Sequence, residues 1–228
     1  YAARPAAPLP VSATGGVRNL VVNWTTPAAT FSGTLTGYNL KWSSSADMTT
    51  CLTTTTAGVG ERSKTISVLP GSSCGTTMAD YTKYWVQVQA VTNLNEGLWS
   101  DPVSARTLNK PSKPLNVTLT PSYTTTPALI VSWNVPASDG GSPITSYTAT
   151  TSTGSKTCTS TSATTCTIDT LPQGSYTVTV TATNAVGTSD PSDASASATT
   201  ISTPTGAPAI TSATGNNGTA SAVVVFTN

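Results

Sequence analysis

Hydrophobic and polar residues alternate with a period of two along several short stretches of this chain. The clearest stretch is LPQGSYTVTVTATNAVG, from Leu171 to Gly187, in which the central positions alternate with threonine. Successive side chains of a β-strand point to opposite faces, so this alternation predicts a strand with one buried face. The residues expected on the buried face are Tyr176, Val178, Val180 and Ala182.

The same alternation occurs earlier, in the stretch YWVQVQAVTNLNEG that begins at Tyr84. Other landmarks repeat with it, because Trp24 and Trp133 stand as many residues apart as Tyr38 and Tyr147 do. Each copy contains about seven short strands separated by turn residues, a pattern typical of antiparallel β-sandwiches. We therefore expect an all-β chain built from tandem copies of one module.

Segments rich in proline predict the boundaries between modules. Asn109–Pro114, with the sequence NKPSKP, contains no apolar residue other than proline, and Ile201–Pro208 is rich in Thr and Pro. Such composition is typical of connecting segments. The first domain is then expected to comprise residues 1–108 and the second residues 109–200.

Residues 201–228 are expected to form a linker followed by the first two strands of an incomplete third module. These strands are predicted at Ala209–Thr214 and Ala222–Thr227, with Phe226 at the tryptophan position of the earlier modules. Two strands alone do not bury a core. We expect either that the chain continues beyond Asn228 or that these strands pair with another molecule. The residues of such a strand-donation interface are Ala222, Val223, Val224, Val225 and Phe226.

Composition narrows the set of partners. Charged residues make up 8% of the chain and the formal net charge is +1. A nucleic-acid surface requires a basic stripe and a membrane-surface helix requires a basic amphipathic pattern, and neither is present in the sequence. No apolar run approaches the roughly 20 residues that span a bilayer. We therefore expect neither nucleic-acid binding nor membrane insertion.

The four cysteines are divided equally between the two modules. This distribution favours the pairings Cys51–Cys74 and Cys158–Cys166 among the three that four cysteines allow, and it leaves free buried thiols as the alternative. Disulfides form in oxidising compartments, so we expect a secreted protein at the cell surface or outside the cell. No zinc-ligand spacing occurs, and no metal or other cofactor is expected.

The side chains that usually carry catalysis are scarce. The chain has no histidine, the commonest general base, and most of its aspartates lie in turn sequences. Asp139, Asp190 and Asp193 contain the oxygen ligands of a weak Ca²⁺ site, but Asp at such positions more often bonds to the local backbone. We expect no catalytic residue and no enzymatic activity.

Two kinds of surface feature remain. Asn23, Asn116 and Asn217 each match the Asn-x-Ser/Thr acceptor of N-glycosylation. Trp42, Trp85 and Trp99 exceed what one sandwich core requires, and an exposed tryptophan is either a platform for a sugar or protein partner or a cover for the rim of the sheet. We expect Trp85 to point outward because its neighbours Tyr84 and Val86 point inward.

The repeated residues resemble those of fibronectin type III domains, in particular the secreted or cell-surface type found in bacteria. The resemblance covers almost the whole chain and implies an immunoglobulin-like fold with Tyr84 and Tyr176 as the tyrosine corners of the two modules. The residues that carry it in the second module are Trp133, Tyr147, Leu171, Gly174, Tyr176, Val178, Val180, Ala182, Asn184 and Gly187.

The resemblance implies spacing, adhesion and protein–protein contact rather than catalysis. Our leading hypothesis is a non-enzymatic extracellular building block of a surface appendage, stalk or filament, with self-association through strand donation and glycan contact as further features. The alternatives are a spacer in a secreted glycan-degrading enzyme and a decoration domain of a virus particle. The Arg-Gly-Asp tripeptide of some family members is absent from the sequence, so that activity is not expected.

Overall fold

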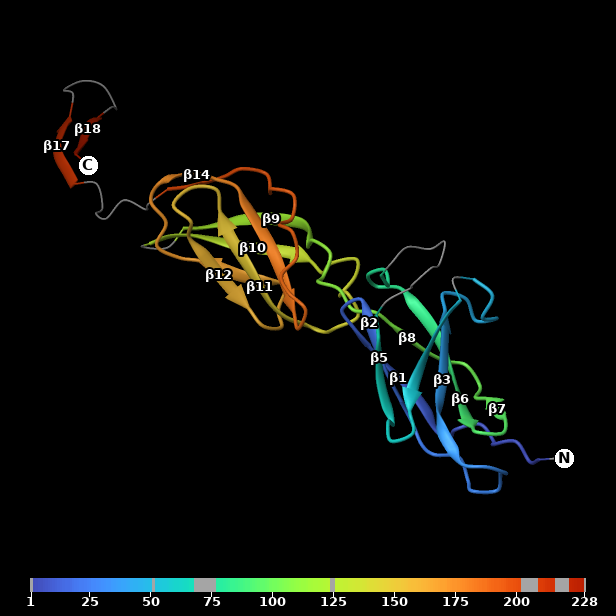
Figure 1. The fold of residues 1–228 in the computed structure, drawn as a ribbon. Helices are drawn as coiled ribbons and strands as arrows, with labels where there is room; N and C mark the ends of the chain where they lie inside the picture. Colours follow the sequence, from blue (N-terminus) through green and yellow to red (C-terminus); the bar gives the residue numbers. More distant parts are fainter. Residues whose placement is uncertain are drawn as a thin grey trace. The chain divides into compact units, whose positions relative to one another are not determined.

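A computed structural model describes residues 2–50, 52–67, 77–123, 126–201, 209–215 and 222–227 of the chain. For Tyr123 and for the strands beyond residue 208, only the backbone is described. Every regular element in these ranges is a β-strand (Figure 1), which confirms the all-β prediction.

The chain forms two compact units. The first comprises Tyr1–Ser112, Pro136–Thr145 and Ala182–Asp190, and the second comprises Lys113–Val135, Ser146–Thr181 and Pro191–Asn228. The segment after Leu108 and two later loop regions thus belong to the first unit. The boundaries expected at residues 108 and 200 therefore stay predictions.

Within its described residues, the first sandwich is built from eight strands in two sheets. One sheet has the order β1-β2-β5, and the other has the order β4-β3-β6-β7 with β8 also paired to β6. The pairings between these strands are all antiparallel. The strands are β1 (Val11–Gly16), β2 (Asn19–Trp24), β3 (Leu35–Ser43), β4 (Thr53–Gly58), β5 (Ser63–Ile66), β6 (Lys83–Thr92), β7 (Glu96–Trp99) and β8 (Val103–Arg106).

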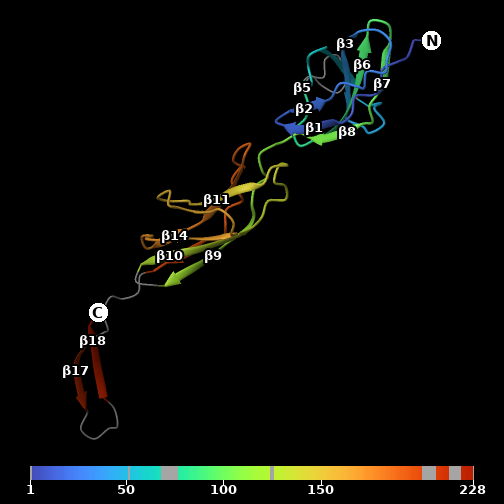
Figure 2. The ribbon, with the colours of Figure 1, turned by 90° about the horizontal axis from the view of Figure 1, so that it is seen from below.

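The second sandwich repeats this arrangement. One sheet has the order β13-β10-β9 and the other β12-β11-β15, while β14 and β16 form a two-stranded sheet. Figure 2 shows β9 and β10 side by side, as their antiparallel pairing requires. The strands are β9 (Leu115–Tyr123), β10 (Pro127–Asn134), β11 (Ile144–Thr151), β12 (Thr157–Ser160), β13 (Thr165–Ile168), β14 (Gly174–Tyr176), β15 (Val178–Asn184) and β16 (Ala198–Thr200).

Both cores contain the side chains expected from the alternation. The predicted inward residues of the two repeated stretches are all buried, including Val88 and Val180, which are 0% exposed. Across each core a tryptophan of one sheet contacts a tyrosine of the other. The ring centroids of Trp24 and Tyr38 lie 5.4 Å apart, as do those of Trp133 and Tyr147. This separation lies in the range preferred by aromatic pairs.

The final strand of each module is interrupted or short. In the first module β7 ends at Trp99 and β8 begins at Val103, and in the second module the final strand, β16, has only three residues. Proline lacks an N–H and cannot donate to a sheet ladder, so regular pairing is interrupted around Pro102 and Pro191.

Three serines replace the missing strand in the second sandwich. The backbone N–H groups of Ser189, Ser192 and Ser195 donate to the carbonyls of Ala182, Val180 and Val178. In return, the hydroxyl oxygens of the same serines accept the N–H groups of those three β15 residues at 2.9–3.0 Å. We call Ser189, Ser192 and Ser195 the serine ladder.

The serine ladder satisfies backbone groups that would otherwise be buried without partners. Successive serines of the ladder pair with every second residue of β15, although they stand three residues apart in their own segment. Two residues therefore lie unpaired with β15 between neighbouring serines, and one of them is Pro191. The first sandwich uses the same device once, because Ser100 makes both bonds to Val88. Buried backbone N–H groups are almost always paired, so these hydroxyls close the sheet edge in place of backbone.

The lead-in before β1 closes another edge. Leu98 of β7 donates its N–H to the carbonyl of Pro5, and Ser32 donates to the carbonyl of Ala3. These residues before β1 thus lie along a sheet edge. Natural sheets commonly cover their edges in this way because an unpaired edge invites pairing with other chains.

The last two strands form an antiparallel hairpin. β17 (Ala209–Gly215) pairs with β18 (Ala222–Thr227), with a register shift between Ile210 and Ser212. The sheet has only these two strands among the described residues. The prediction of two strands in this segment is therefore confirmed, while their membership of a third module stays a prediction.

We expect Ser192→Ala to destabilise the second sandwich by about 1–3 kcal/mol, because it leaves the buried Val180 N–H without its acceptor. Chemical denaturation followed by circular dichroism measures this change. Ser197→Ala is the matched control: Ser197 is exposed in the same segment and bonds Ser175. Its effect should stay within about 0.5 kcal/mol. Equal unfolding free energies for the two variants would show that the ladder hydroxyls contribute nothing.

Candidate functional site: the outer face of the first sandwich

The outer face of the sheet β4-β3-β6-β7 carries a row of uncharged polar side chains. Asn39 of β3 stands opposite Gln89 of β6 and Thr56 of β4, while Gln89 stands opposite Trp99 of β7. These positions alternate with the buried Tyr38 and Leu40, Val88 and Ala90. Cross-strand neighbours lie within side-chain contact distance, so the sheet brings residues from four strands together.

A groove of about 450 Å³ runs over these residues. A second groove of about 290 Å³ adjoins it and shares Asn39 and Thr56. Its floor includes Gly37 and Gly58, which are paired across β3 and β4 and have no side chains to fill the space. The larger groove is lined by Asn39, Thr54, Thr55, Thr56, Gln89, Glu96 and Trp99.

Hydrogen bonds between amides fix the middle of the groove. Asn39 Nδ2 donates to Gln89 Oε1 at 3.0 Å, and Gln89 Nε2 donates to the carbonyl of Gly97 at 2.9 Å. Gln89 is only 4% exposed, so these bonds hold it in one orientation. The carbonyl oxygen of Asn39 remains as an acceptor. In the part of the chain that the structure describes, the hydroxyls of Thr54 and Thr56 make no hydrogen bond to protein.

Trp99 forms an aromatic wall of the groove. Its side chain is partly exposed, and the Lys41 ammonium lies 4.3 Å from the ring centroid. A cation at this distance is attracted to the ring and restricts its orientation. Trp85 lies on the same sheet face but outside the groove, with Lys83 5.0 Å from its centroid. Its partial exposure agrees with the outward orientation predicted for it.

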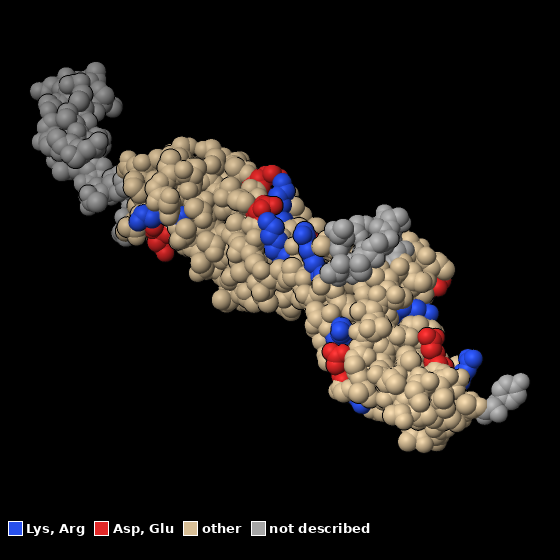
Figure 3. Space-filling view, viewed as in Figure 1, with Lys and Arg blue, Asp and Glu red and all other residues tan. Residues whose placement is uncertain are grey.

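Charges are sparse near the groove. Glu96 is its only ionisable lining residue among those described, with Lys41 at its tryptophan. Figure 3 shows the charged side chains of the face in view in small separate groups, with most of the described surface formed by other residues. The shifted carboxylates lie elsewhere: a bidentate bond from Arg18 lowers the pKa of Asp80, and bonds from Ser45 and Thr49 lower the pKa of Asp47.

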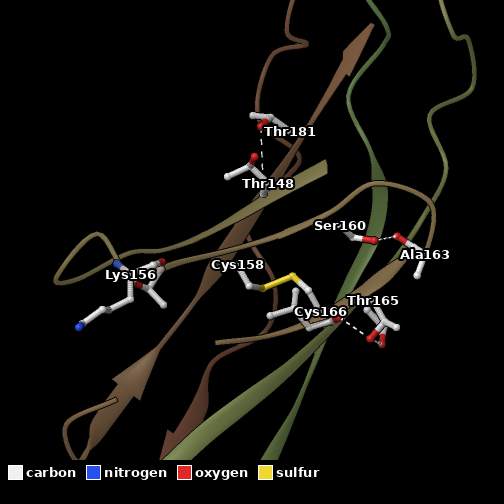
Figure 4. Close-up of a disulfide and its surroundings, with 11 residues drawn as sticks. Thr148, Lys156, Cys158, Ser160, Ala163, Thr165, Cys166 and Thr181 are labelled. Carbon is white, nitrogen blue, oxygen red and sulfur yellow. Dashed lines mark hydrogen bonds between the residues drawn. A yellow bond between two sulfur atoms is a disulfide. The ribbon is translucent and has the colours of Figure 1, made fainter. Parts of the chain in front are cut away.

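The second sandwich contains a disulfide between Cys158 of β12 and Cys166 of β13, with Cα atoms 5.9 Å apart (Figure 4). These strands belong to different sheets, so the bond joins the two sheets at their edge. The turn between them is closed by a bond from the Ser160 hydroxyl to the carbonyl of Ala163 at 2.7 Å. Cys51 and Cys74 lie outside the described residues, and their pairing stays a prediction.

The two tyrosines expected to form corners bond differently. The Tyr176 hydroxyl donates to the carbonyl of Pro172, four residues upstream, at 2.9 Å. The Tyr84 hydroxyl instead accepts the N–H of Ala79 at 2.9 Å. A tyrosine corner is a bond from the hydroxyl to nearby upstream backbone, so Tyr176 has that geometry and Tyr84 has a variant of it.

The remaining predicted residues are distributed over the chain. Asn23 on β2 and Asn116 on β9 are exposed, so both are accessible as acceptors, while Asn217 lies outside the described residues. Asp190 and Asp193 form ion pairs with Lys110 and Lys113 at 2.7 Å. The backbone of Ala222–Thr227 forms β18 as expected.

Two kinds of feature are absent from the described ranges. No group of three or more His, Cys, Asp or Glu side chains lies close enough there to hold a metal ion. No described element is a helix of the length and apolarity needed to cross a bilayer.

Comparison with known proteins identifies similar chains. The sequence model of the family described as "Fibronectin type III domain" matches residues 6–106 and 112–198. Among solved structures, that of the FN1–FN3 domains of chicken CNTN1 is similar, with 18% sequence identity and a TM-score of 0.44. The match covers 87% of this chain and 66% of that one, slightly under two thirds of its length. No curated protein sequence matches this chain.

We expect the double variant Cys158→Ser/Cys166→Ser to lose about 2.5 kcal/mol of stability in the second sandwich, because the short loop is no longer closed in the unfolded chain. Amide exchange at Leu129 and Val131 should then accelerate about 70-fold where it proceeds by global unfolding. Peptides of the first sandwich are the internal control and should not change. Unchanged exchange at Leu129 and Val131 would contradict the stabilising role of this bond.

Proposed function

We propose, on the premise that this chain belongs to the fibronectin type III family, that it is a non-enzymatic structural and adhesive segment acting outside the cell. Tandem domains of this family are in general structural modules that mediate protein–protein contact. The finer proposal is that this chain is a building block of a surface appendage, stalk or filament, assembled in part by donation of a strand.

The hairpin β17–β18 is the observation that carries this proposal. Its two strands pair with each other, and within the described ranges no third strand pairs with either of them. An isolated two-stranded hairpin is marginally stable in water, so it gains by pairing with further strands. Addition of a strand to an exposed sheet edge is a recurrent mode of protein assembly, in which main-chain hydrogen bonds supply the affinity.

Several sheet edges of the two sandwiches are already covered and are therefore not open to such pairing. Pro5 covers the edge of β7, and the serine ladder covers that of β15. Because those backbone groups already have partners, they do not accept a new strand. These closed edges support association through the hairpin rather than through random edge contacts.

The Cys158–Cys166 bond supports action outside the cell. Disulfides persist in oxidising compartments and are rare in the cytosol. The low charge of the chain fits an assembled or glycosylated surface, because Asn23 and Asn116 are exposed acceptor positions. Extracellular localisation and glycosylation are parts of this proposal.

We expect the intact chain to self-associate in sedimentation velocity as its concentration rises. The variant Val224→Lys/Val225→Lys should remain monomeric, since adjacent strand residues point to opposite faces and one lysine must meet any apolar face. Asn216→Lys/Asn217→Lys is the matched control, because it adds the same charge between the two strands and should associate normally. A monomeric native chain, with Val223–Phe226 amides exchanging as fast as in free peptide, would sink the strand-donation proposal and favour a spacer role.

A further inference from the structure

We propose that the groove on the outer face of the first sandwich binds a neutral oligosaccharide chain. The site consists of Asn39, Thr54, Thr56, Gln89, Glu96 and Trp99. It does not involve the hairpin, so this inference stands or falls separately from self-association.

The polar groups of the groove match the hydrogen-bonding needs of sugar hydroxyls. A sugar hydroxyl both donates and accepts, and the groove offers both capacities through the amide of Asn39 and the hydroxyls of Thr54 and Thr56. The Asn39–Gln89–Gly97 chain of hydrogen bonds holds the amides in place before any ligand arrives. Groups that are already oriented lose less entropy on binding, which favours affinity.

Trp99 supplies the apolar contact that a sugar ring needs. Sugar rings present C–H groups of slight positive charge, and an aromatic ring is negative at its face. Lys41 lies over one face of the Trp99 ring, 4.3 Å from its centroid, so a sugar ring would pack against the opposite face. Pockets for small ligands typically combine apolar or aromatic walls with a few placed polar groups, which is the arrangement here.

The shape and charge of the site favour a neutral chain over other ligands. The groove lies on a sheet face, whereas an added β-strand would bind along an edge. A single lysine at its rim is too little positive charge for a nucleic acid or a sulfated glycan. The adjoining groove shares Asn39 and Thr56, so a chain of several sugar rings has room to extend across β3 and β4.

The test is isothermal titration calorimetry of the intact chain with four neutral hexasaccharides: cellohexaose, xylohexaose, chitohexaose and maltohexaose. At least one should bind in the millimolar range or tighter. Trp99→Ala should weaken that binding at least about tenfold, which corresponds to the loss of one substantial contact. Trp85→Ala is the matched control, because Trp85 lies on the same sheet face outside the groove, and its affinity should match that of the native chain.

Two further variants keep the test decisive if Trp99→Ala does not fold. Thr56→Val removes one exposed hydroxyl while retaining a strand-forming side chain, and Trp99→Phe keeps an aromatic wall. The first should weaken binding severalfold, and the second should retain most of it. No heat of binding with any of the four probes, or equal loss in the Trp85 and Trp99 variants, would overturn the proposal. Binding confined to a sulfated heparin hexasaccharide would replace it with recognition of an acidic glycan.

Discussion

The contact between a tryptophan and a tyrosine of opposite sheets organises both sandwiches. Trp24 and Tyr38 meet with ring planes inclined by 59°, and Trp133 and Tyr147 meet at 51°. Since each ring comes from a different sheet, the contact sets how the two sheets face each other. Strand geometry then assigns every neighbouring residue to the core or to the outer face. The polar groove of the first sandwich is thus a consequence of the same alternation that fills its core.

The core could be predicted from the sequence because its signal is local. Alternation within one strand is enough to place Val86 and Val88, or Val178 and Val180, in the interior. Recurrence of the alternating stretch, together with the tryptophan and tyrosine that precede it, was enough to predict a tandem arrangement of sandwiches. The pairing of Cys158 with Cys166 was also accessible, because each cysteine has its nearest candidate partner within the same module.

The groove and the final strands could not be predicted in the same way. Asn39, Gln89 and Trp99 come together only through the register of three strands, which no single stretch of sequence encodes. The pairing of the final segment with β15 departs from a regular ladder. The three-residue spacing of Ser189, Ser192 and Ser195 was the available signal for this pairing. It differs from the two-residue period of a strand, so it does not indicate a strand. The bonds to β15 come from side-chain hydroxyls that lie outside regular secondary structure.

The serine ladder also bears on how the second sandwich responds to mechanical force. Its hydroxyls meet β15 at three separate points, at Ala182, Val180 and Val178. Sliding the segment along β15 by one residue would put a non-serine residue at every one of these points and break all three hydroxyl bonds together. Bonds that break together share a load, whereas bonds that break in turn each bear it alone. Force applied along β15 would therefore break the three hydroxyl bonds in one step, although the segment that supplies them has almost no regular secondary structure.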